Sequence, residues 1–134
     1  MNNFDNFLKT NLYGVFTTVD GEKPKTRVFQ YLFTVDDQIY FGTTNNKPVY
    51  EQLVKNPNVS YCTFSKDFDP VLSVNGRVIF DNNMQLKERA INEYPSIKNL
   101  YHSPDNPIFE IFYIDVEEYV TFSFAKGSET ININ

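Results

Sequence analysis

Apolar and polar residues alternate along most of this chain, and a two-residue period is typical of half-buried β-strands. The alternating segments are 13–19, 26–35, 38–43, 59–65, 71–80 and a longer one at 108–124. Turn signals at Asp20-Gly21 and Asp36-Asp37 separate the first three segments. Three strands joined by tight turns predict an antiparallel meander at the start of the chain.

Other segments follow the helical period of about 3.6 residues. Residues 3–10 predict a short docking helix, residues 48–55 a second helix and residues 84–94 a third, with a further turn at 96–101. Pro48 suits the first position of the second helix, because a proline lacks the N–H that is unpaired there in any case. The helices are few and short, so the pattern favours a sheet-rich fold.

The predicted fold is mainly β: a six-stranded antiparallel β-barrel with a few short helices, formed by a single domain over residues 1–134. The length suits one domain. Aromatic residues make up 16% of the chain, with 13 Phe, 9 Tyr and no Trp, and such residues are enriched in strands. Closing the sheet into a barrel would also hide the strand edges of so aromatic a chain.

Composition and charge exclude several classes of function. No apolar run reaches the roughly 18 residues of a membrane span, and the N-terminus MNNFDNFLKT lacks the apolar core of a signal peptide. The single cysteine excludes an internal disulfide framework, so we expect a cytoplasmic protein. The net charge is −5 and no basic stripe is visible, which argues against a nucleic-acid partner.

The most polar corner of the chain lies in IYFGTTNNKPVYEQL, residues 39–53. Thr43, Thr44 and Lys47 fall where a predicted strand ends and a helix begins. Free N–H groups and the positive end of the helix dipole make such a corner suitable for phosphate. Simple capping of the helix by Asn and Thr is the alternative, and on this feature alone capping is favoured.

Arg27 provides the second indication of a site. It shares a strand face with aromatic residues such as Phe29, and its guanidinium suits bidentate contact with phosphate. A hairpin through Asp36-Asp37 pairs residues whose numbers add up to about 73. That register would place Arg27 beside Asn46, so that Arg27 and Lys47 converge on one corner. We therefore favour an anion site over capping.

Other candidates for chemistry are weak. Gly42 fits either a close approach by a flat ligand or a kink at the strand end. His102, the only histidine, is expected on the surface, and Cys62 as a small buried hydrophobe. The acids of the last strand, such as Glu110, indicate a solvated face. The chain has no metal or nucleophile motif, so we assign no catalytic residue and no metal.

The order of these motifs resembles the pyridoxamine 5′-phosphate oxidase-like family, the FMN-binding split barrels, in its short stand-alone bacterial form. The resemblance covers residues 11–124 and lies in TRVFQYLF, IYFGTTNNKPVYEQLVKNPNVSY and VNGRVIF. The matching positions are Arg27-Val28-Phe29, Phe41-Gly42-Thr43, Lys47, Gln52-Leu53, Asn56-Pro57 and Gly76.

The resemblance implies a six-stranded split barrel that forms a homodimer, with FMN at the subunit interface. Arg27 and Lys47 would hold the phosphate, and Thr43 and Thr44 would bond phosphate or ribityl oxygens. Val28, Phe29 and Gln30 would line the isoalloxazine, and the partner's strand near 71–73 would face it.

The leading hypothesis is an FMN-dependent oxidoreductase acting on a small molecule. Vitamin B6 oxidation is not expected, because the chain ends FAKGSETININ and lacks the Trp and Arg residues with which the longer oxidases of this family end. The alternative is a non-catalytic module that binds or carries flavin, haem or deazaflavin, since all three occur on the scaffold that the chain resembles.

Overall fold

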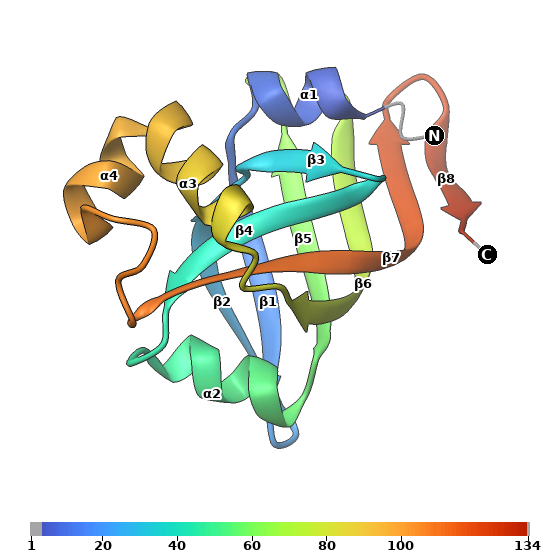
Figure 1. Ribbon diagram of the computed structural model, residues 1–134. Coiled ribbons are helices and arrows are strands. Elements are labelled where there is room, and N and C mark those ends of the chain that lie inside the picture. The colour runs from blue at the N-terminus through green and yellow to red at the C-terminus, as the bar shows by residue number, and fades with distance from the viewer. Residues whose placement is uncertain (1–3, 134) are drawn as a thin grey trace.

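A computed structural model describes residues 4–133, which form eight strands and four helices (Figure 1). The strands are β1 (Tyr13–Asp20), β2 (Lys23–Gln30), β3 (Phe33–Val35), β4 (Gln38–Thr44), β5 (Asn58–Phe64), β6 (Val71–Phe80), β7 (Phe109–Ser123) and β8 (Gly127–Asn132). The helices are α1 (Asp5–Thr10), α2 (Pro48–Lys55), α3 (Met84–Glu93) and α4 (Pro95–Tyr101). No helix of these residues is long and apolar enough to cross a membrane.

All eight strands belong to one antiparallel sheet, in the order β2-β1-β5-β6-β7-β4-β3 with β8 beside β7. Six strands in a closed barrel were predicted, and both parts of that prediction are wrong. The count differs because the segment 26–35 is split into β2 and β3, and because β8 follows the long strand. The sheet is not a closed ring, since its end strands β2 and β3 are not paired with each other.

The split between β2 and β3 lies at Tyr31 and Leu32. The Tyr31 N–H donates to Leu12 O at 2.7 Å, which continues the pairing with β1. The Leu32 N–H donates instead to Tyr40 O in β4 at 3.0 Å. One continuous stretch of chain therefore changes partner within two residues, and it brings the two ends of the sheet together.

The side chains of β4 point alternately to two apolar clusters. Ile39 and Phe41 join a cluster with Val49 and Leu53 of α2, which we call the α2 side. Tyr40 joins the second cluster, with residues of α3 and α4, which we call the α3–α4 side. Figure 1 shows α2 at the end of the sheet where β1 turns into β2, and α3 and α4 near β3 and β4.

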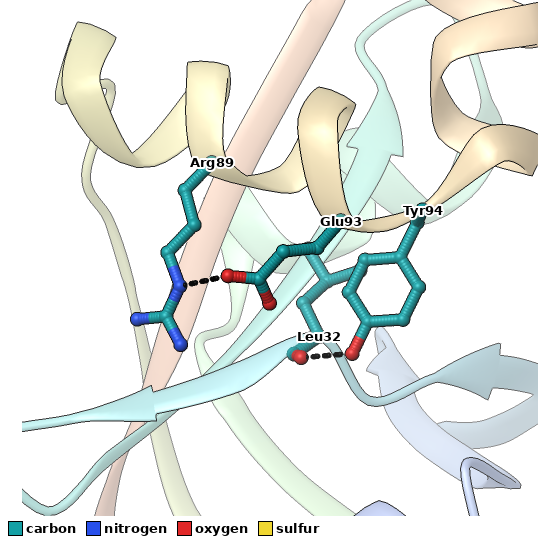
Figure 2. Close-up of polar contacts among 4 residues, drawn as sticks. All are labelled: Leu32, Arg89, Glu93 and Tyr94. Carbon is teal, nitrogen blue, oxygen red and sulfur yellow. Dashed lines mark hydrogen bonds and ion pairs between the residues drawn. The ribbon is translucent and has the colours of Figure 1, made fainter.

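The α3–α4 pair is held to the sheet by a few specific contacts (Figure 2). The Tyr94 hydroxyl donates a hydrogen bond to the carbonyl of Leu32, at the break between β2 and β3. On α3, Arg89 forms an ion pair with Glu93 at 2.6 Å and lies over the ring of Phe33, 4.3 Å from its centroid. The helical insert thus fixes the point at which the strand changes partner.

Most predicted elements are confirmed. The first hairpin forms through Gly21, whose φ of +65° is accessible to glycine at little cost. The helix predicted over residues 48–55 is present with those bounds, and the strand predicted over 71–80 likewise. The first helix begins at Asp5; residue 3, where it was expected to start, lies outside the described residues.

Candidate functional site

The corner before α2 does not use its polar residues to cap the helix. Lys47 occupies the N-cap position and makes no side-chain cap hydrogen bond. The Asn45 amide does not cap the helix either, because its Nδ2 donates to Pro107 O at 2.9 Å and to Glu110 Oε2 at 3.0 Å. The capping alternative therefore has no support from these side chains, and the start of α2 remains open to a ligand.

The two threonines of the corner point to opposite faces of β4. Thr44 lies on the α3–α4 side, where its Oγ1 is 2.7 Å from the Tyr101 hydroxyl in a buried hydrogen bond. Thr43 follows Ile39 and Phe41 toward the α2 side and is 2% exposed. Its Oγ1 is buried and has no hydrogen-bond partner among the described residues. A buried hydroxyl without a partner is costly, and such groups call for an explanation.

Arg27 lies against the side of α2. Its Nη2 donates to Gln52 Oε1 at 2.9 Å, and its Nη1 donates to Phe16 O at 3.0 Å and to Lys25 O at 3.2 Å. Gln52 Oε1 also accepts a hydrogen bond from the Thr18 hydroxyl at 2.6 Å. Burial lowers the pKa of the Arg27 guanidinium, but arginine remains charged at neutral pH.

The predicted route by which Arg27 reaches the corner is wrong. The register that pairs Phe33 with Tyr40 is confirmed, but this pairing ends where β3 begins. Beyond that point β2 pairs with β1, while Thr44 pairs with Phe109 of β7. Arg27 therefore does not lie beside Asn46 through a hairpin, and it meets the same helix from the side, at Gln52. Gln52 follows Lys47 by five positions, a rise of about 7.5 Å along a helix.

Two adjoining hollows lie along α2; Lys47 lines one and Gln52 the other, whereas Arg27 and Thr43 line neither. One is lined by Asn45, Asn46 and Lys47, the other by residues of the β1–β2 turn and by Gln52, and Pro48 and Glu51 border both. We call this combined surface the α2 trough. Lys47 is exposed, and neither Lys47 nor Arg27 forms an ion pair with a carboxylate of residues 4–133. Glu51 is the acid that borders both hollows.

The charges beside α2 are of the kind that a phosphate ester, such as the end of FMN, requires. Lys47 and the guanidinium of Arg27 would neutralise its charge, and the unpartnered Thr43 hydroxyl lies on the same side of β4 as α2. Thr44 is already engaged with Tyr101, so its side chain contributes to packing at this corner.

The three residues predicted to line a flavin ring lie on an edge strand, since β2 ends the order of the sheet. The side chain of Val28 is 64% exposed. Phe29 points the other way, into the α2 side, where its ring lies 5.0 Å from that of Phe16. Gln30 shares the outer face with Val28. The side chain of Phe29 therefore does not face a ligand on the outer face.

The remaining candidates do not join this site. Gly42 pairs regularly with Ile111, and a Cβ there would approach the Phe109 ring to 3.2 Å, so glycine makes room for that ring. Cys62 is half-buried, and His102 is exposed beyond α4 as expected. The described residues contain no cluster of three or more His, Cys, Asp or Glu able to hold a metal.

Two residues of the site, Gln52 and Thr18, were not predicted to act in it. Gln52 belonged to a recognised motif but had no role assigned. It lies three residues after Val49 and next to Leu53, both of which face the core. The position of Gln52, a polar residue beside the apolar face of a short helix, was the sequence signal that could have identified it. Thr18 gave none, because it is one of several threonines in an alternating strand.

Solved structures with the same fold are numerous, although no family model and no curated protein matches the chain. A NimC/NimA family protein from Clostridium acetobutylicum shares 30% identity at a TM-score of 0.85, over 96% of this chain and 88% of the other. A second Clostridium acetobutylicum protein, related to general stress protein 26 and of the pyridoxinephosphate oxidase family, has a TM-score of 0.78 at 15% identity, over 96% and 90%. A haem-binding protein from Mycobacterium smegmatis has a TM-score of 0.75 at 12% identity, over 92% and 54%.

The first of these likenesses extends to sequence over nearly the whole of both chains, while the other two show the shared fold alone. The resemblance found in the order of the motifs is confirmed. This chain belongs to the pyridoxamine 5′-phosphate oxidase-like family of split barrels.

Proposed function

We propose that this protein binds FMN, with the phosphate beside α2 between Lys47 and Arg27, next to the α2 trough, and the isoalloxazine along the outer edge of β2. The observation that carries the proposal is the state of Arg27. Three neutral oxygens hold its guanidinium, and of its five N–H donors two are left for an anion. Lys47 supplies a second positive charge at the start of the same helix.

The edge of β2 supports the placement of the ring. Tyr31 N–H bonds to Leu12 O, and antiparallel pairs alternate between bonded and non-bonded positions. The backbone groups of Phe29 therefore point to β1, whereas those of Val28 and Gln30 point outward from the sheet. Free donors and acceptors on an edge strand suit the alternating carbonyl and N–H groups on the pyrimidine side of a flavin.

The outer face of the sheet supports a homodimer. The registers place Val28, Val15, Cys62, Ser73 and Val120 in one row across five strands. A contiguous row of small, mostly apolar side chains on one side of a sheet is typical of an interaction surface. A second copy of this chain is the proposed occupant, and its strand β6 would then face the flavin bound along β2.

Bound FMN would supply the redox chemistry, accepting or donating a hydride or single electrons. The chain would bind the phosphate, orient the ring and cover one of its faces with the partner subunit. The proposed activity is that of an oxidoreductase on a small molecule, and no side chain is assigned as an acid or a base.

A flavin-binding measurement tests this proposal. The purified protein is titrated into FMN, and quenching of flavin fluorescence is followed. We expect a dissociation constant in the micromolar range or below, and a loss of at least about a hundredfold in affinity for the double variant Arg27→Ala, Lys47→Ala. The matched control is Lys98→Ala, Lys126→Ala, which removes two exposed positive charges elsewhere. Equal affinity in the two double variants would contradict the proposal.

Absorbance of the purified protein separates the cofactors. The haem-binding neighbour makes haem the second candidate, but the one histidine, His102, lies beyond α4 and outside the α2 trough. We therefore expect the absorbance bands of an oxidised flavin rather than the Soret band of haem. Reduction of the bound flavin by NADH or NADPH, followed by oxidation with a quinone, distinguishes an enzyme from a carrier.

The dimer has a separate test. Sedimentation velocity at micromolar concentration should give a single species of twice the chain mass. Val28→Glu, which places a charge at the β2 end of the row on the outer face, should shift it toward monomer. A stable monomer in the wild-type protein would contradict the dimer.

A further inference from the structure

We propose that Gln52 is a positioning residue that sets how strongly this site prefers a phosphorylated ligand. The inference rests on the proposed function, because it concerns the same phosphate site. Gln52 lies at the junction of three elements: it belongs to α2, and its Oε1 accepts hydrogen bonds from Thr18 of β1 and Arg27 of β2.

The position of Gln52 is well determined. Val49 and Leu53, on the same side of α2, are 6% and 1% exposed and anchor the helix on the core. Thr18 is fully buried, and its hydroxyl holds the amide oxygen at 2.6 Å. The acceptor that meets Arg27 Nη2 is therefore fixed by the core, and it orients the guanidinium in turn.

The chemistry of the acceptor matters as much as its position. A glutamate would fit the same space and accept the same two hydrogen bonds, and it would form an ion pair with Arg27. The guanidinium would then already be neutralised, and a phosphate would meet a carboxylate at close range. An amide oxygen orients the arginine and leaves its charge available to the ligand.

The other acceptors of Arg27 fit this interpretation. Phe16 O and Lys25 O are backbone carbonyls and carry no net charge. Every described acceptor of Arg27 is therefore neutral. In a chain of net charge −5 with 17 acidic residues, an arginine held only by neutral oxygens is suited to an external anion.

The test compares FMN with riboflavin, which has the same ring and no phosphate. Gln52→Glu should weaken FMN binding by roughly tenfold to a hundredfold and leave riboflavin binding within about twofold, because only the phosphate meets the new charge. The matched control is Val54→Glu. Val54 is 59% exposed and lies two residues along the helix, on the opposite side, so it adds the same charge without touching Arg27.

A second variant separates charge from position. Gln52→Met keeps the length of the side chain and removes the hydrogen-bond acceptor, so the ratio of FMN to riboflavin affinity should fall by several-fold, less than in Gln52→Glu. A ratio in Gln52→Glu equal to that of the wild type would overturn the inference while leaving FMN binding intact. Should Gln52→Glu fail to fold, an unchanged ratio in Gln52→Met would overturn it. A wild-type protein that binds no FMN would refute the proposed function itself.

Discussion

Thr43 and Thr44 are neighbours in β4, but their side chains lie in different environments on opposite faces of the strand. Thr44, on the α3–α4 side, shares a buried hydrogen bond with Tyr101. Thr43, on the α2 side, buries its hydroxyl without a partner. The same residue type therefore completes the packing on one face and leaves a polar atom unused on the other.

The difference extends to the two sides of the molecule as a whole. On the α3–α4 side the polar groups are paired within the chain: Tyr40 donates to Asp81, and Tyr94 to Leu32 O. On the α2 side, Arg27 meets neutral oxygens alone. Since unpaired buried polar groups lower stability, the unpaired Thr43 hydroxyl is what the proposed ligand site on the α2 side would use.

High pH should produce the largest effect, and it should act on buried tyrosines of both sides. Burial raises the pKa of Tyr40, Tyr94 and Tyr101 on that side and of Tyr31 and Tyr61 on the other. The unfolded chain then loses these protons near pH 10, before the folded chain does, so stability is full below pH 10 and falls as the pH rises above it.

Urea unfolding between pH 7 and 11.5 measures this fall. Tyr101→Phe should be less stable than the wild type at pH 7 and should lose stability less steeply above pH 10. Parallel curves for the two proteins would contradict the role given to Tyr101.

Thr44→Val should reduce the free energy of unfolding by about 1–3 kcal/mol, because the Tyr101 hydroxyl is left buried without its partner. FMN affinity should stay within about twofold, since the side chain faces away from the α2 trough. Thermal unfolding and flavin fluorescence measure the two quantities. A large loss of FMN affinity with unchanged stability would show that Thr44, rather than Thr43, contacts the ligand.

Thr43→Val should have the opposite pattern. Replacing an unpartnered buried hydroxyl by a methyl group should leave stability unchanged or raise it by up to about 1 kcal/mol. FMN affinity should fall several-fold if the hydroxyl bonds the ligand. Unfolding by urea, with and without FMN, reports both effects in one experiment. A destabilised variant with normal affinity would show that the Thr43 hydroxyl has a structural role.

Glu51→Gln should give the smallest effect. The glutamate borders the α2 trough, so its removal should tighten FMN binding by about twofold to threefold at low salt. The gain should vanish near 0.5 M salt, where exposed charges are screened over a few ångströms. An equal gain at both salt concentrations would show that the effect is not electrostatic.

The sequence predicted the elements well because their signals are local. The period of two marked β1, β4, β5 and β6, and Pro48 marked the start of α2. The number of strands and the closure of the sheet were wrong. β8 was not predicted as a separate strand, and the change of partner at Tyr31 and Leu32 depends on which strands lie beside them. The one local sign of that change is the run Tyr31-Leu32-Phe33, three consecutive buried residues that interrupt the alternation.

The site was also predicted only in part, because some of its contacts depend on tertiary packing. Arg27 and Lys47 could be identified as candidates from their residue types and from the resemblance. The contact of Arg27 with Gln52 depends on how α2 lies against β1 and β2. It cannot be derived from the register of a single hairpin. The opposite directions of Thr43 and Thr44 do follow from alternation, which also predicts that their side chains cannot share one ligand atom.

The partner change at Tyr31 and Leu32 constrains how this family member can evolve. Because β2 and β3 are one run of chain, the alignment of β1 with β2 and that of β3 with β4 cannot slide independently. Deleting one residue at this joint would turn either Phe29 or Phe33 from the interior to the exterior. Length variation should therefore accumulate at the β1–β2 turn, in the α3–α4 insert and at the chain ends, while the spacing from Arg27 to Phe33 stays constant.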